Sequence, residues 1–107
     1  MNQIIVTTPI HRVTLGPGQL GNWFVDNVSQ HTVRYFSPVI LNTIIEGFAK
    51  HDQSIEIVRV FYILKGDIHT EDGSGGARTY QANVTVQNLD QAHAVTFDLL
   101  MLEIPQT

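Results

Sequence analysis

Apolar and polar residues alternate most regularly near the C-terminal end of the chain. Between Arg78 and Asn88 the even positions are apolar, and from Val95 to Met101 the odd positions are apolar. A period of two residues is typical of a strand with one buried face. A loop at residues 89–92 would pair Val86 with Val95, Val84 with Phe97, Ala82 with Leu99, and Tyr80 with Met101. The pattern therefore predicts a β-hairpin with one apolar face.

A third long strand is predicted upstream of this hairpin, over Ile55 to Ile68. The inner residues that match the apolar face of the hairpin are Val58, Val60, Tyr62, Leu64 and Ile68. Ile57, Phe61 and Ile63 make the other face apolar too, and a strand with two apolar faces is usually covered on both sides. The three strands together predict an antiparallel meander.

The first half of the chain predicts two short strands followed by helices. Ile4 to Thr8 and His11 to Leu15 are rich in β-branched residues, which favour strands. From Gln19 to Phe36 the apolar residues recur roughly at helical spacing. Ser37 and Pro38 favour the start of a second helix that ends at Lys50, because proline at the first helical position needs no N–H donor.

These elements predict one α+β domain over residues 1–107. One or two helices would pack on one face of an antiparallel sheet, which comprises the C-terminal three-stranded meander and a short N-terminal strand pair. The length is close to the most common domain size and is sufficient for a single core.

Composition narrows the possible partners. The chain has a net charge of −4, and its 6 Lys and Arg residues are scattered singly, so we expect no nucleic-acid partner. The absence of cysteine excludes disulfides and thiolate metal sites. No apolar run approaches membrane-spanning length, and the N-terminus does not have the pattern of a secretory signal. We therefore expect a cytoplasmic protein with no membrane partner.

The segment GPGQLGN places Gly16, Gly18 and Gly21 at the spacing of a dinucleotide-binding motif. That motif also requires an acidic residue about 20 residues further on, inside a parallel βαβ unit. No acidic residue lies near that position, and Pro17 interrupts the turn. We interpret the segment as a turn between a strand and a helix, with no cofactor.

The segment GDIHTEDGSGGARTY is the densest in chemical groups. Asp67, His69 and Glu71 alternate and could ligate a divalent ion, but the spacing excludes an EF-hand. Because glycine-rich turns with charged strand ends are routine, we favour a solvated hairpin tip without metal. Histidines and serines elsewhere lack the spacing of known catalytic motifs.

The leading functional hypothesis is a non-enzymatic protein that binds another macromolecule or assembles with itself, as small acidic inhibitors, immunity proteins and assembly subunits do. It is supported by the lack of catalytic motifs and by a surplus of apolar strand surface. We expect a homodimer or a protein partner on the outer face of the sheet. The residues expected in this interface are Phe61, Ile63, Leu100, Leu102 and Ile104.

The alternative is a small-ligand-binding protein or an isomerase-like enzyme. Its pocket would lie between helix and sheet. The residues expected to line it are Trp23, Tyr62, Tyr80, Phe97 and Met101. Stabilisation by a small ligand would favour this alternative.

Overall fold

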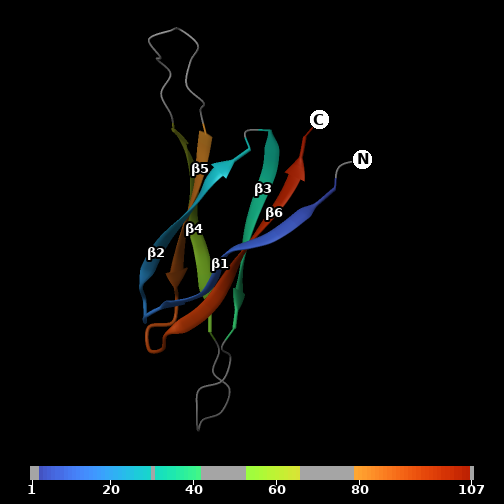
Figure 1. Cartoon of the computed structure of the whole chain (residues 1–107). Helices are drawn as coiled ribbons and strands as arrows, with labels where there is room; N and C mark the ends of the chain where they lie inside the picture. The colour runs from blue at the N-terminus through green and yellow to red at the C-terminus, as the bar shows by residue number, and fades with distance from the viewer. Residues whose placement is uncertain (1–2, 30, 42–52, 66–78, 107) are drawn as a thin grey trace.

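The computed structural model describes residues 3–29, 31–41, 53–65 and 79–106, and this part of the chain is a β-sandwich (Figure 1). The six strands are β1 (Ile5–Leu15), β2 (Leu20–Val28), β3 (Thr32–Ile40), β4 (Ile55–Lys65), β5 (Thr79–Asn88) and β6 (Val95–Pro105). Sheet A has the order β1-β6-β3, and sheet B has the order β2-β5-β4. All neighbouring strands are antiparallel.

The predicted α+β class is wrong, because the described residues form strands and no helix. The first predicted helix covers β2 and most of β3. In β2, Trp23 and Val25 are half-buried, whereas the apolar side chain of Phe24 is exposed. A bulge then follows Val25 and turns Val28 inward, with Asn27 at a φ of 59°. Exposed apolar residues and a shift of parity together imitate helical spacing.

The second predicted helix is also wrong over Pro38 to Ile40, which belong to β3; residues 42–50 lie outside the described part of the chain. The N–H of Leu41 donates to Thr96 O of β6 at 2.8 Å. Backbone groups alternate in direction along a strand, so Pro38 faces the open edge. Proline lacks an N–H and is tolerated there.

The two predicted N-terminal strands form one continuous strand, β1, which pairs with β6. Two bulges interrupt its register, between Thr7 and Ile10 and between Ile10 and Val13. Arg12, in the second bulge, has a φ of 51°. These irregularities explain why the sequence pattern breaks near Pro9.

The predicted hairpin of β5 and β6 is wrong, because these strands are the centres of different sheets. Their apolar faces meet across the sandwich instead of side by side. The buried core residues are Leu15, Val28, Ala82, Val84, Val86, Val95, Phe97, Leu99 and Met101. The rings of Trp23 and Phe97 meet edge to face, with centroids 5.5 Å apart. The inner faces predicted for both strands are therefore confirmed, although their pairing is not.

Strand β4 pairs with β5 in antiparallel fashion, as predicted. A bulge between Ile57 and Arg59 shifts the alternation of inward and outward residues along the strand. Ile57 lies opposite Val86 on the core side, while Val58, which was assigned to the inner set, is 51% exposed. Beyond the bulge, the strand pairs Val60 with Val84, Tyr62 with Ala82 and Leu64 with Tyr80. Ile68 lies outside the described residues.

The segment GPGQLGN forms a tight turn, as predicted, but it leads from β1 into β2 and not into a helix. The N–H of Gln19 donates to Gly16 O at 3.1 Å. Gly18 has a φ of +68°, a conformation that L-residues rarely adopt. The turn thus carries the chain from sheet A to sheet B.

Candidate functional site

The outer face of sheet A is apolar at the end where β1 begins and β6 ends. On β6, the outward residues Leu100, Leu102 and Ile104 alternate with the inward Leu99 and Met101. Cross-strand register places Leu102 between Val6 of β1 and Tyr35 of β3, and Ile104 beside Val33. We call this surface the apolar face; its members are Val6, Val33, Tyr35, Leu100, Leu102 and Ile104.

The apolar face is accessible to solvent and carries no charged residue. Val6 is 57% exposed and Tyr35 is 59% exposed, and the three members on β6 are half-buried. The charged neighbours on these strands, Arg34 and Glu103, occupy alternate positions and pair with each other at 3.0 Å. Solvent-exposed apolar groups that cluster on one sheet face are typical of an interaction surface.

The other end of the same sheet face carries polar groups, beside one exposed apolar residue, Val39, which lies opposite Asp98. The hydroxyls of Thr14 and Thr96 are 2.8 Å apart. His11 Nδ1 lies 2.8 Å from Asp98 Oδ1, which also accepts the backbone N–H of Arg12 at 2.7 Å. The apolar face therefore ends at a hydrogen-bonded polar border.

The five predicted interface residues divide between opposite sides of the sandwich. Leu100, Leu102 and Ile104 lie on sheet A, whereas Phe61 and Ile63 belong to β4 of sheet B. The sequence pattern identified the outward-facing positions. It placed them on one sheet because it predicted a meander.

The outer face of sheet B is more polar than that of sheet A. Asn83 lies between Phe24 of β2 and Phe61 of β4, and its amide donates to Gln81 Oε1 at 3.1 Å. Gln81 in turn donates to Asp26 Oδ1 at 2.8 Å. Side-chain hydrogen bonds thus occupy the surface between the two aromatic residues.

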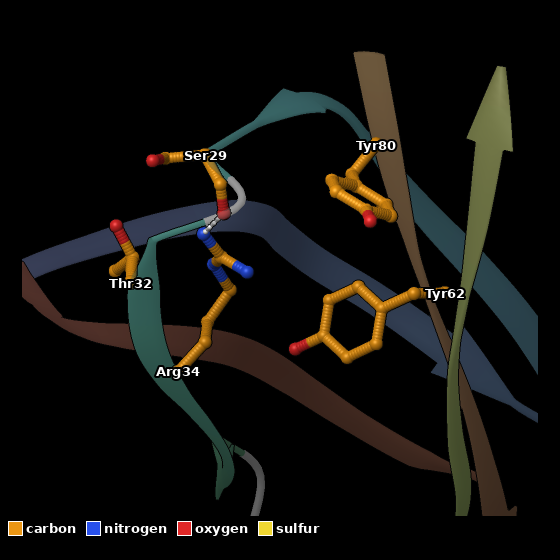
Figure 2. Close-up of a pocket in the computed structure, with 5 residues that line it drawn as sticks. All are labelled: Ser29, Thr32, Arg34, Tyr62 and Tyr80. Carbon is orange, nitrogen blue, oxygen red and sulfur yellow. Dashed lines mark hydrogen bonds between the residues drawn. The ribbon is translucent and has the colours of Figure 1, made fainter. Parts of the chain in front are cut away.

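A cavity of about 310 Å³ lies between the sheets at the end near the β2–β3 connection (Figure 2). Its lining residues come from both sheets: Ser29, Thr32, Arg34, Tyr62 and Tyr80. Figure 2 shows the guanidinium group of Arg34 facing the two tyrosine side chains. Tyr62 is 44% exposed, so the cavity is open to solvent.

Arg34 is held in place by contacts on one side of its guanidinium group. Nε donates to Glu103 Oε2 at 3.0 Å, and Nη2 donates to Ser29 O at 2.8 Å. The side chain is 3% exposed, and that of Glu103 is 20% exposed. The guanidinium carbon lies 5.8 Å from the ring centre of Tyr62, within the range of a cation–π contact.

Two of the five predicted pocket residues, Tyr62 and Tyr80, line this cavity. Trp23, Phe97 and Met101 do not, since Phe97 is fully buried and Met101 is 6% exposed within the core. Arg34 was missed because its segment was assigned to a helix. The signal that could have identified it is the alternation of β3, in which Arg34 shares the inward positions with Phe36.

Among the described residues, no cluster of three or more His, Asp or Glu side chains could hold a metal ion. Asp67, His69 and Glu71 lie outside those residues. The search of the described segments also found no helix of the length and hydropathy needed to cross a membrane.

No protein-family model, no curated protein and no solved structure matches the chain.

Proposed function

We propose that this protein is a non-enzymatic self-assembly protein, and that two copies associate through the apolar face of sheet A. The observation that supports this proposal most directly is the row formed by Val6, Leu102 and Tyr35 across three strands. When another surface covers an apolar row of this kind and removes it from water, the free energy falls. An apolar sheet face can pack against another sheet face about 10 Å away.

A second copy is favoured over an unrelated partner because the apolar face contains no charge. In a twofold symmetric dimer, the same patch lies on both sides of the interface, and residues near the axis face themselves. Charged residues in the patch would therefore meet like charges. The polar border at His11 and Asp98 marks the end of the surface that packs against the second copy.

The proposal assigns no cofactor to the chain. A cytoplasmic location and the lack of a nucleic-acid or membrane partner stay predictions from the sequence. Phe61 and Ile63, on sheet B, are not part of the proposed interface.

The experiment measures the mass of the protein in solution by sedimentation equilibrium over a range of concentrations. We expect the native chain to be a dimer and Tyr35→Glu to be a monomer with an unchanged circular dichroism spectrum. Tyr35 is suitable because its exposure of 59% means that the change costs the monomer little. The double variant Leu100→Lys with Leu102→Glu should dissociate the dimer too.

Phe24→Glu is the matched control. Phe24 is an aromatic residue on the outer face of sheet B and is 55% exposed, close to the value for Tyr35. We expect this variant to stay dimeric. A native chain that is monomeric at every concentration, or a dimer that Phe24→Glu disrupts and Tyr35→Glu does not, would contradict the proposal.

A further inference from the structure

The cavity between the sheets offers hydrogen-bond donors with no carboxylate in its lining. Its lining residues are one arginine, two tyrosines, Ser29 and Thr32. A guanidinium group has five N–H donors. The contacts with Glu103 and Ser29 use two of them. The other three have no hydrogen-bond acceptor among the described residues, and the guanidinium group faces the tyrosine side chains (Figure 2).

The ion pair between Arg34 and Glu103 is not explained by stability alone. Replacing a buried ion pair with apolar residues of similar volume is often neutral or stabilising. Here the pair joins neighbouring strands β3 and β6 within one sheet, where apolar residues occupy the adjacent inward positions Phe36 and Met101. Glu103 binds Nε and therefore fixes the orientation of the guanidinium plane toward the cavity. A fixed, partly unsatisfied guanidinium group is suited to bind an acceptor.

The two tyrosines supply the other half of the site. Their side chains come from the adjacent strands β4 and β5 of sheet B, opposite the arginine on sheet A (Figure 2). Each phenol can donate one hydrogen bond, and each ring presents an apolar surface. Neither hydroxyl has a hydrogen-bond partner among the described residues. A planar apolar group that carries an anionic acceptor matches both properties.

We propose that this cavity binds a small aromatic carboxylate. Its carboxylate accepts hydrogen bonds from Arg34 and from the hydroxyls of Tyr62 and Tyr80, and its ring packs against the tyrosine rings. The volume of about 310 Å³ is at the lower end of the range for ligand sites, which sets a limit to the size of the ligand. Because Glu103 already compensates the charge of Arg34, we expect a dissociation constant of about 1 mM for a ligand as small as benzoate.

The test is a titration of the ¹⁵N-labelled chain with benzoate, followed by NMR. We expect saturable shifts at the backbone of Thr32 to Arg34, at Tyr62 and Tyr80, and at the Nε–H of Arg34. Benzamide, which has nearly the same shape without the charge, should bind at least about tenfold more weakly. Inorganic phosphate tests whether any anion suffices, and it should not compete.

The double variant Tyr62→Phe with Tyr80→Phe removes the two hydroxyls and keeps the rings. It should weaken benzoate binding at least about tenfold, since a hydrogen bond to a charged acceptor is strong. Tyr35→Phe is the matched control on the apolar face and should leave binding unchanged. Benzoate binding that the double variant leaves intact would overturn the proposal, as would benzamide or phosphate binding as tightly as benzoate, or shifts confined to the apolar face. The readout is separate from oligomeric mass, so failure here does not affect the proposed dimer.

Discussion

Asn88 links two of the connections between the sheets, and its replacement tests how far that link stabilises the fold. The side chain is fully buried. Its Nδ2 donates to the carbonyl oxygens of His93 at 2.8 Å, Gly16 at 3.1 Å and Leu15 at 3.3 Å. Its Oδ1 accepts the N–H of Asp90 at 2.9 Å. One amide group thus joins the end of β1 to the connection between β5 and β6.

The expected loss of stability follows from these contacts. An amide nitrogen has two hydrogens, so its three carbonyl contacts count as two hydrogen bonds, and the bond from Asp90 is the third. At about 1 kcal/mol each, Asn88→Ala should lower the free energy of unfolding by about 3 kcal/mol. Asn88→Asp has nearly the same shape, but it turns a carboxylate oxygen toward three carbonyls. We expect it to destabilise the protein at least as much as alanine does.

Denaturant unfolding, followed by circular dichroism and by Trp23 fluorescence, measures the difference. Gln87→Ala is the matched control. Gln87 directly precedes Asn88, faces outward and makes no side-chain hydrogen bond within the described part of the chain. It should change stability by less than about 0.5 kcal/mol. If Asn88→Ala lowers the free energy of unfolding no more than this control, or if Asn88→Asp is as stable as the native chain, the hydrogen bonds of Asn88 do not stabilise the fold by the amount expected.

Three further substitutions test the core, the outer face of sheet B and the first turn. Phe97→Ala should cost about 3–5 kcal/mol, because Phe97 is fully buried and packs against Trp23. Thr85→Ala should cost about 1 kcal/mol or less, since its hydroxyl bonds Asn22 at an exposed position; equal losses in denaturant melts would refute the assigned faces. Gly18→Ala should cost about 1–2 kcal/mol, because an L-residue at a φ of +68° is strained, and an unchanged melting temperature would show that the turn tolerates it.

The sequence predicts which residues of β5 and β6 face the core, but it does not show whether these two strands pair with each other. Alternation has the same form whether Val84 and Phe97 are neighbours in one sheet or meet across two sheets. The alternation therefore predicts the inward faces correctly, but the pairing of β5 with β6 that it predicts is wrong. The connection at residues 89–94 crosses from sheet B to sheet A, and the Asn88 side chain bonds both His93 in this connection and Leu15, which is 73 positions away in the sequence.

The pattern predicts helices because apolar residues occupy outward as well as inward positions of β2 and β3. Phe24 and Tyr35 are apolar but exposed, and the bulge before Val28 shifts the parity of β2. Neither a bulge nor an outward aromatic residue has a distinct signature in a single sequence. For the same reason the sequence predicts only part of the cavity lining. Tyr62 and Tyr80 lie on segments that are predicted as strands, whereas Arg34 lies on β3, which the pattern assigns to a helix.

The topology of sheet A also fixes the order in which it can form during synthesis. Its central strand, β6, follows the other five strands of the described residues, and both β1 and β3 pair with it. A ribosome therefore completes β1 and β3 well before their shared partner exists, whereas β4 and β5 become available in succession and pair directly. Until β6 emerges, the strand edges of β1 and β3 are open to chaperones and to strands of other nascent chains. A chain that stops after β5 contains β2, β4 and β5 of sheet B and lacks the centre of sheet A.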